Sequence, residues 1–166
     1  MPLRILGVDP GLADLGWAVV EVAGDVTRLV AHGAVSTKPA DGTDLDRVVL
    51  IAAAVQALIE DHAPHAVAVE PWVEVYAGKG ANTTAAHALG CVLGAVRTVC
   101  AGARVRFIEG ERAQGWRVAL GLPRTATKAA CQERVRVVLG LSRVIRPQHS
   151  SDACAVAIVA ARRGLR

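Results

Sequence analysis

The sequence predicts an α/β protein in which a mixed β-sheet is flanked by helices. Of its 166 residues, 52% are hydrophobic and only 3% are aromatic, so Ala, Val, Leu and Ile must form the core. Such a core suits this class better than an aromatic-rich β-sandwich. Three strand-like segments with short connections open the chain and predict an antiparallel meander. A long helical segment and another apolar strand follow, which predicts a parallel crossover.

Chain length and net charge limit the number of domains and the kinds of binding partner. We expect residues 1–166 to form a single domain, because the chain is long enough for a full core and too short for two domains of ordinary size. Lys and Arg number 19 against 15 Asp and Glu, a net charge of +4 that weakly favours binding to a polyanion. Most basic residues lie in the second half of the chain. Solvated helix faces account equally well for part of this asymmetry.

The four cysteines stand far apart and lack the paired spacing of zinc sites. No secretory segment precedes them, so we expect reduced, mostly buried thiols in a cytoplasmic protein. The apolar runs are interrupted well before the roughly 20 residues that a membrane span needs. We therefore expect no membrane partner.

The strand predicted over residues 3–9 ends in Asp9, which a Pro-Gly turn follows at once. This order places a carboxylate at the carboxyl edge of a sheet beside a tight turn, where open α/β sheets tend to place their chemistry. Asp and Gly are also ordinary turn residues, so a structural role is equally open. Two further strands are predicted over residues 14–22 and 28–37, separated by a Gly-Asp turn.

A loop over residues 38–43 ends with Thr43, which we expect to cap a helix with acids in its first turn. Apolar residues at helical spacing predict a helix of about five turns. They are Leu45, Val48, Val49, Ala52, Val55 and Leu58 or Ile59. The strand predicted over residues 66–70 again ends in a carboxylate, Glu70. Because it follows a crossover, it should lie parallel in the same sheet and bring Glu70 to the edge that carries Asp9.

The second half alternates helices with one more strand. The Ala-rich stretch over residues 82–101 predicts a helix whose small residues suit close packing against another helix or a partner chain. These small residues are Ala85, Ala88, Gly90 and Gly94. A short strand is predicted over residues 104–108. Helices over residues 109–120 and 126–139 come next, and a basic loop over residues 142–148 leads into the last helix.

Three carboxylates thus stand at the ends of elements: Asp9, Glu70 and Asp152, the last in the first turn of the final helix. Mutual repulsion makes such a cluster costly unless a cation neutralises it. Carboxylate oxygens suit Mg²⁺ or Mn²⁺, which in a two-metal arrangement activate a water and stabilise the leaving oxygen of a phosphodiester. A helix cap at Asp152 and a solvated strand end at Glu70 are the structural alternatives.

The order and context of these residues resemble the RuvC family of Holliday-junction resolvases, in the ribonuclease-H-like superfamily. Three segments carry the resemblance, which covers nearly the whole chain. They are residues 5–11 (Ile-Leu-Gly-Val-Asp-Pro-Gly) with Gly16 beyond, residues 68–70 (Ala-Val-Glu), and residues 149–157 at the start of the last helix. The resemblance implies a ribonuclease-H-like mixed five-stranded sheet flanked by helices. It also implies a metal-dependent endonuclease that resolves four-way DNA junctions by paired phosphodiester hydrolysis.

By this resemblance, Asp9, Glu70 and Asp152 are catalytic metal ligands, and His149 fills a fourth position that Asp or His occupies in relatives. The implied cofactor is Mg²⁺, with two ions, and Mn²⁺ is able to substitute. His149 lies three residues before Asp152, so the two share a helix face. A histidine there coordinates metal as neutral imidazole or assists proton transfer. A surface histidine beside a helix cap is the alternative.

The resemblance also gives the basic second half a purpose, because a four-way junction presents many phosphates. The family's contacts to the DNA backbone correspond loosely to four residues: Arg112, Arg117, Arg124 and Lys128. Lys128 is preferred among them, because residues 121–128 echo a glycine-bearing loop followed by a lysine.

The loop after Glu70 is a further candidate DNA contact and also departs from the family. Relatives place an aromatic residue soon after the catalytic glutamate, a part that Trp72 or Tyr76 can play by stacking on a base, with Lys79 in the same loop. A buried anchor is the other role open to Trp72. The family usually has Glu-Gln where this chain has Glu70-Pro71, and the loop here is longer, so junction preference is less secure than nuclease chemistry.

Resolvases of this family act as homodimers with two separated active sites, and the helix over residues 82–101 is our candidate dimer contact. A branch-migration helicase is a candidate further partner. Other functions stay open. One is a related nuclease on flaps, forks or RNA-containing duplexes, and another is a non-catalytic junction-binding protein. A third, a nucleotide-binding protein of the actin or sugar-kinase type, needs two such domains where this chain has room for one.

Overall fold

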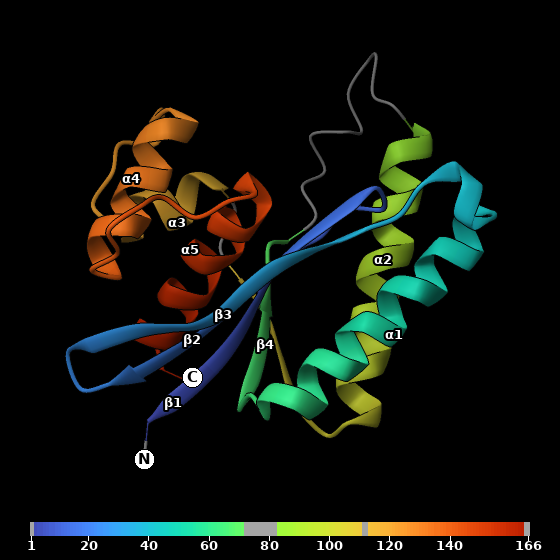
Figure 1. The fold of residues 1–166 in the computed structure, drawn as a ribbon, viewed down its shortest axis with the longest axis horizontal. Helices are drawn as coiled ribbons and strands as arrows, with labels where there is room; N and C mark the ends of the chain where they lie inside the picture. The colour runs from blue at the N-terminus through green and yellow to red at the C-terminus, as the bar shows by residue number, and fades with distance from the viewer. Residues whose placement is uncertain (1, 72–82, 111–112, 165–166) are drawn as a thin grey trace.

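The protein is built on one five-stranded mixed sheet, seen in a computed structural model that describes residues 2–71, 83–110 and 113–164 (Figure 1). The strands lie in the order β3-β2-β1-β4-β5. Their bounds are β1 Leu3–Asp9, β2 Asp14–Ala23, β3 Val26–Ser36, β4 Ala66–Val69 and β5 Arg106–Glu109. Strands β1 to β3 form the antiparallel meander and β4 pairs parallel to β1, as the sequence predicted. Strand β4 also pairs parallel to β5.

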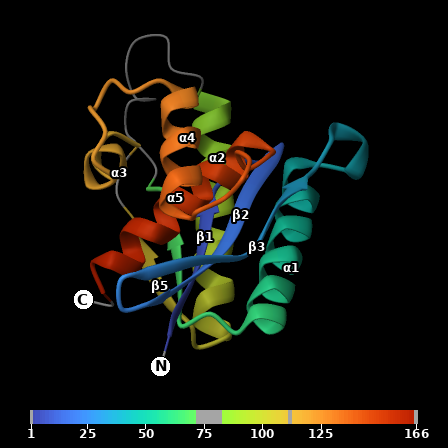
Figure 2. The same cartoon turned by 60° about the vertical axis from the view of Figure 1, so that its left-hand side comes forward.

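Helices cover both faces of this sheet (Figures 1 and 2). They are α1 Asp44–His62, α2 Thr83–Gly102, α3 Ala113–Ala119, α4 Lys128–Val138 and α5 Gln148–Arg162, with a short 3₁₀ turn at Pro39–Asp41. Helices α1 and α2 pack on one face, and α5, with α3 and α4 against it, packs on the other. The predicted α/β architecture is confirmed.

Side-chain alternation along β1 and β4 decides which way the candidate site faces. In β1, Leu6 and Val8 pack among the residues of α1 and α2, whereas Ile5 packs beneath α5. In β4 the valines face α1 and α2 and the alanines face α5. Because successive side chains in a strand point to opposite faces, Asp9 and Glu70 follow on the α5 side of the sheet.

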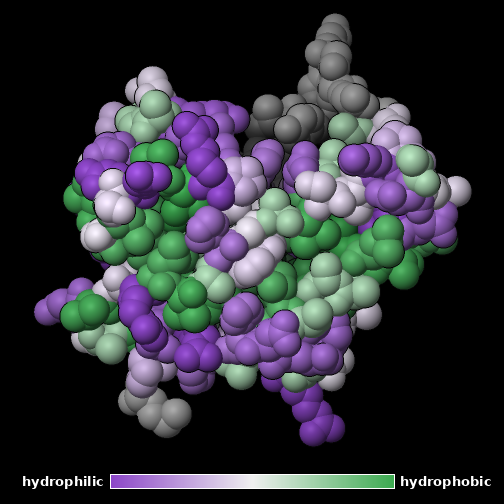
Figure 3. Space-filling model, viewed as in Figure 1, coloured by the Kyte–Doolittle hydropathy of each residue, from purple (hydrophilic) through white to green (hydrophobic). Residues whose placement is uncertain are grey.

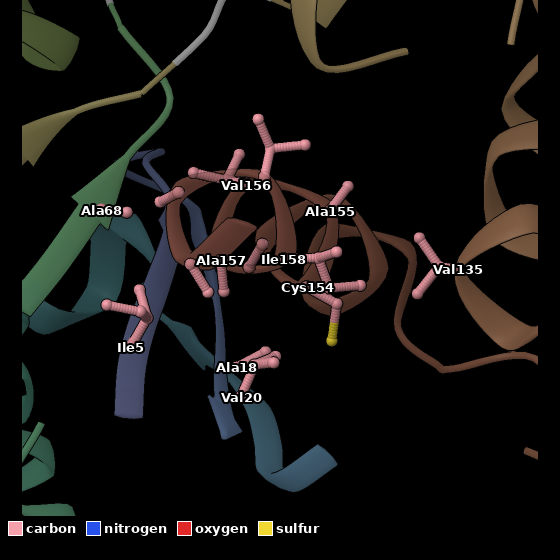
Figure 4. Close-up of a cluster of buried hydrophobic side chains, with 14 of the residues drawn as sticks. Ile5, Ala18, Val20, Ala68, Val135, Cys154, Ala155, Val156, Ala157 and Ile158 are labelled. Atoms are coloured by element: carbon pink, nitrogen blue, oxygen red, sulfur yellow. The ribbon is translucent and has the colours of Figure 1, made fainter. Parts of the chain in front are cut away.

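Helix α5 lies unusually close to the sheet because glycines face it. A Cβ on Gly7 of β1 would overlap the backbone carbonyl of Ala153, and a Cβ on Gly16 of β2 would overlap the backbone of His149. Figure 4 shows α5 lying across the strands, with Ala157 and Cys154 among the side chains that meet Ile5, Ala18 and Val20. The start of α5 is thereby fixed against the end of β1.

Helix α1 begins directly after Thr43, the capping residue that the sequence predicts. The side chain of Thr43 accepts a hydrogen bond from the Asp46 amide, and the Asp46 carboxylate accepts one from the Thr43 amide at 2.8 Å. This reciprocal pair satisfies two amides that the first helical turn leaves free. The predicted cap and helix are confirmed.

Boundaries in the second half differ from the prediction. Strand β5 begins at Arg106 and not at residue 104, because Arg104 adopts a left-handed conformation with φ of 55° and closes the turn after α2. It also extends to Glu109, so the predicted helix over residues 109–120 is wrong at its start. Helix α3 covers only Ala113–Ala119. A β-branched and aromatic pair, Phe107-Ile108, favoured the strand, whereas the charged residues around it carried no signal for its ends.

The four cysteines are free thiols, three of them buried and Cys91 exposed, as expected. Burial raises the pKa of Cys100 to about 11 and raises the pKa of Cys154 as well. The thiolate is the reactive form of cysteine, so these buried groups pack as small apolar side chains.

Helix α2 is more apolar than we expected from the sequence. Residues Thr84–Gly102 are long and apolar enough, by length and composition alone, to cross a membrane, so the expectation that all apolar runs are too short is wrong by this measure. One such helix is weak evidence for a span. Only 22% of its apolar window is buried, and Figure 3 shows hydrophobic patches on the side of the molecule that α1 and α2 occupy.

Candidate active site at the end of β1 and β4

Asp9 and Glu70 leave the sheet side by side. Asp9 is the last residue of β1, and Glu70 directly follows β4, which pairs parallel to β1 with Val8 opposite Val69. The ladder continues one step beyond the strand, because the Glu70 amide donates a hydrogen bond to the Val8 carbonyl at 3.1 Å. The two carboxylates therefore share one edge and one face of the sheet, as the strand-acid pattern predicted.

Helix α5 brings the other two candidate residues to this edge. It begins at Gln148, with Pro147 in the capping position, so Asp152 lies in the fifth helical position and is no helix cap. His149 lies one turn earlier on the same face, and its Nδ1 is 2.8 Å from Asp9 Oδ2. The His149 side chain is 48% exposed and that of Asp9 is 18% exposed, so the pair links the buried edge to solvent.

Glu70 has the most strongly raised pKa of the three acids. Burial, followed by the negative charges of Asp9 and Asp152, raises its pKa from 4.5 to about 7. The indole of Trp116 and the charge of Arg117 act in the opposite direction. A carboxyl with such a pKa is only partly ionised at neutral pH without a cation, which is a common feature of functional sites.

The other two carboxyls show the same pattern. Burial raises the pKa of Asp9 against the lowering effect of the His149 hydrogen bond. Burial and the charge of Asp9 raise the pKa of Asp152, whereas a hydrogen bond from Gln148 lowers it. Lys128 lies near enough to lower both pKa values. The acids thus repel one another in a partly dry place, and a bound cation would relieve that repulsion.

The donor chemistry of this edge suits a hard divalent cation, since the candidate ligands are carboxylates with one imidazole. In residues 2–71, 83–110 and 113–164, however, no three His, Cys, Asp or Glu side chains are placed so that they could hold one ion together as they stand. The Asp9 carboxylate is engaged with His149. Binding therefore requires side-chain rotation, which the exposed His149 permits. The ligand roles of Asp9, Glu70, His149 and Asp152 stay predictions.

The candidate DNA-binding residues divide into those near the edge and those elsewhere. Lys128, the first residue of α4, acts electrostatically on Asp9 and Asp152, and Arg117 of α3 acts on Glu70. Arg124 is exposed, and its backbone carbonyl accepts a hydrogen bond from Arg117 Nη1 at 3.1 Å. Four predicted residues lie outside the described part of the chain: Trp72, Tyr76, Lys79 and Arg112.

A hollow of about 520 Å³ adjoins the site on the side of His149. The turn between β1 and β2 lines it with Pro10 and Leu12, and the starts of α1 and α2 line it with Arg47 and Leu89. It is open to solvent, and its wall is mixed polar and apolar. Such a hollow beside a carboxylate edge offers room for part of an extended substrate.

Sequence reasoning missed two residues that contact the site. The Gln148 side chain donates a hydrogen bond to the Asp152 carboxyl. The two residues are four apart on a helix, so this contact was predictable from the sequence. Trp116 reaches Glu70 from α3. Nothing in the sequence marks this second contact, because it joins two segments that meet only through the fold.

Comparisons with known proteins give one family. The family model described as crossover junction endodeoxyribonuclease RuvC matches residues 5–160. The RuvC endonuclease of Chloroflexus aggregans is 38% identical over 94% of this chain and 91% of its own length. That of Rubrobacter xylanophilus is 37% identical over 93% of this chain and 82% of its own length.

Solved structures give the same result. The Thermus thermophilus RuvC structure is 32% identical, covers 98% of this chain and 97% of its own, and has a TM-score of 0.82. A structure of the same protein in complex with Holliday junction substrate matches equally well. The yeast mitochondrial Holliday junction resolvase shares the fold, with a TM-score of 0.66 at 12% identity over 95% of this chain.

The raised pKa of Glu70 predicts a pH-dependent stability in the metal-free protein. The native state holds the Glu70 proton between pH 4.5 and about 7, where the unfolded state has lost it. The free energy of unfolding should therefore fall as the pH rises through this window, by on the order of 3 kcal/mol. Glu70→Gln should remove most of that fall, measured by urea unfolding in chelator at several pH values.

Glu109→Gln is the matched control, because Glu109 also ends a neighbouring strand but is exposed and paired with Arg97 at 2.9 Å. This variant should keep the wild-type pH dependence. If the free energy of unfolding changed equally with pH in wild type and Glu70→Gln, the pKa of Glu70 would not be raised as predicted.

Proposed function

The chain belongs to the RuvC family of crossover junction endodeoxyribonucleases, and on this premise we propose that it resolves four-way DNA junctions by metal-dependent phosphodiester hydrolysis at the β1–β4 edge. Its similarity to a structure solved with Holliday junction substrate supports four-way junction DNA as the substrate. The match spans nearly the whole chain and nearly the whole of its relatives, so the activity is proposed for the chain as a whole.

One observation within the molecule carries the proposal. Three carboxyls with raised pKa values and one histidine, from β1, from the residue after β4 and from α5, meet at one edge of the sheet. The proximity of the three carboxylates opposes folding, because their charges repel one another. A function that needs concentrated negative charge accounts for the arrangement.

A divalent cation is the group that this charge would hold. RuvC family nucleases are metal-dependent, and we propose Mg²⁺, two ions, with Mn²⁺ able to substitute. Asp9, Glu70 and Asp152 would hold the metal, with His149 in the fourth position. When bound, the metal supplies Lewis-acid chemistry to the attacking water and to the leaving oxygen of the phosphodiester.

His149 has a second role open to it as a proton carrier. Its Nδ1 faces Asp9, so when Nδ1 carries the proton and donates to that carboxylate, Nε2 is free to accept another. The His149 side chain is 48% exposed and lines the adjoining hollow. We propose that His149 accepts or passes the proton of the attacking water, oriented by Asp9.

Basic residues next to the edge would bind the DNA backbone. Lys128 and Arg117 already act on the carboxyls of the site, which supports their placing phosphates beside it, and Arg124 is exposed beyond them. Arg112 and Lys79 complete the proposed backbone contacts. Trp72 or Tyr76 is proposed to stack on a base near the junction centre.

We propose a homodimer formed through α2, which would place two active sites on opposed strands. Small residues on the exposed side of α2 support this contact, among them Gly90 and Gly94, beside which the described part of the chain leaves open space. Helix α1 alongside adds the exposed side chains of Leu45, Val49 and Leu50. A partner surface would cover these apolar groups. A branch-migration helicase is a further proposed partner.

Asp9→Asn should abolish junction cleavage, because the amide keeps the shape of the side chain and removes the charge that a metal ligand needs. We expect a loss of at least about 100-fold in cleavage of a four-way DNA junction with Mg²⁺, with junction binding retained. The measurement is single-turnover cleavage on gels beside a binding assay in chelator.

Asp25→Asn, in the exposed turn between β2 and β3, is the control and should cleave like wild type. Flaps, forks and RNA-containing duplexes belong in the same assay. Full activity of Asp9→Asn would contradict the proposed chemistry. Preferred cleavage of another substrate would favour the related-nuclease alternative, and binding without any cleavage in Mg²⁺ or Mn²⁺ would favour a non-catalytic protein.

Gly90→Glu should convert the proposed dimer to a monomer. A Cβ at this position meets nothing among the described residues of the protomer, so the fold should tolerate the new side chain, while a buried charge at the contact would be costly. Gly102→Glu, equally open at the end of α2, is the control and should remain dimeric. Analytical ultracentrifugation measures both, and a dimeric Gly90→Glu would place the interface elsewhere.

A further inference from the structure

Trp116 has a buried polar atom that the core does not explain. The residue lies in α3, is only 2% exposed, and packs in the hydrophobic cluster beneath α5. Its Nε1 is buried and makes no hydrogen bond of full geometry with any residue in the described part of the chain. Burying an indole N–H without an acceptor is energetically costly, and Phe at this position would avoid that cost.

Glu70 is the candidate acceptor for this N–H, because the indole acts on its carboxyl. The two side chains interact closely enough for the indole to lower the pKa of Glu70, although the contact falls short of full hydrogen-bond geometry. Backbone pairing brings the two segments together, because the Gly110 amide, shortly before α3, donates to the Val69 carbonyl at 2.8 Å. Residue 69 directly precedes Glu70, so α3 is anchored beside the candidate ligand.

Arg117 also contacts the indole ring. Its guanidinium carbon lies 5.5 Å from the centre of the Trp116 ring, and its Nη1 donates to the carbonyl of Arg124. A ring that is buried in the core and also contacts a guanidinium has little freedom to rotate. The direction of its N–H is therefore fixed by packing.

We propose that Trp116 is a positioning residue, whose indole N–H holds the Glu70 carboxylate in the orientation that divalent-cation binding requires. The inference rests on the proposed function, in which Glu70 is a metal ligand. An indole is a donor only, so it restrains one carboxylate oxygen without competing for the metal. Hydrogen bonds of this kind to metal-bound side chains orient the ligands, and their loss typically weakens metal binding by about 10-fold to 100-fold.

The first test observes the contact itself in metal-free protein by ¹H–¹⁵N correlation of the indole groups. The chain has three tryptophans, so Trp116→Phe identifies its resonance directly, and Trp17→Phe with Trp72→Phe identifies it by elimination if Trp116→Phe fails to fold. The Trp116 indole proton should move upfield in Glu70→Ala and Glu70→Gln. Glu109→Gln, which removes an exposed carboxylate from the neighbouring strand end, should leave it in place.

The second test separates the N–H from the ring. Trp116→Phe keeps an aromatic side chain in the core and removes the donor, and it should weaken Mn²⁺ binding, measured by calorimetry, by about 10-fold. Junction affinity in chelator should stay at the wild-type value while the cleavage rate at subsaturating Mn²⁺ falls. Trp17→Phe, in β2 beneath α1 and α2, should leave Mn²⁺ affinity and cleavage unchanged.

The outcomes are distinct from those of the proposed function. An indole resonance indifferent to Glu70→Ala, or Mn²⁺ affinity unchanged in folded Trp116→Phe, would overturn the positioning role even if the wild type resolves junctions. If the wild type failed to cleave junctions, the shift of the indole proton and the loss of Mn²⁺ affinity would still support the role. Lower thermal stability of Trp116→Phe with unchanged Mn²⁺ affinity would identify a core anchor and contradict the proposal.

Discussion

The contact of α5 with the sheet is the constraint on which the candidate site depends. Gly7 and Gly16 leave room for the backbone of the helix at Ala153 and His149, so the helix start is fixed against the carboxyl end of β1. The parallel pairing of β1 with β4 then supplies the other half of the edge. Residues 9, 70, 149 and 152 meet because these two contacts hold, and any larger side chain on either glycine would move the helix that carries two of them.

This placement concentrates negative charge where water is scarce. Each of the three carboxyls has a raised pKa, and in each case burial is the largest cause. The protein offsets part of the cost with polar neighbours: His149 on Asp9, Gln148 on Asp152, and the indole of Trp116 on Glu70. These groups orient the carboxylates more than they neutralise them, and Lys128 and Arg117 act only from nearby. A divalent cation would neutralise the negative charge that remains.

The sequence predicted those parts of the site that follow from local pattern. An apolar strand ending in an acid, repeated after a helical crossover, was enough to place Asp9 and Glu70 at one edge, and Thr43 marked the start of α1. The close bond between His149 and Asp9 and the approach of Trp116 to Glu70 depend on how distant elements pack, which no spacing encodes. The start of β5 was misplaced because Arg104 takes a left-handed conformation that glycine usually occupies, so the residue type at this position gave no signal of the turn. Residues 72–82 hold three predicted DNA contacts and lie outside the described part of the chain.

The central claim is that this edge of the sheet is a divalent-metal site. Anomalous diffraction from crystals soaked in Mn²⁺ tests it most directly, because the signal locates the ion independently of any activity. We expect at least one Mn²⁺ within about 2 Å of carboxylate oxygens from Asp9 and from Glu70 or Asp152, with the Asp9 to His149 contact rearranged. Mn²⁺ bound elsewhere while this edge stays empty, or held by only one of the carboxylates, would contradict the account.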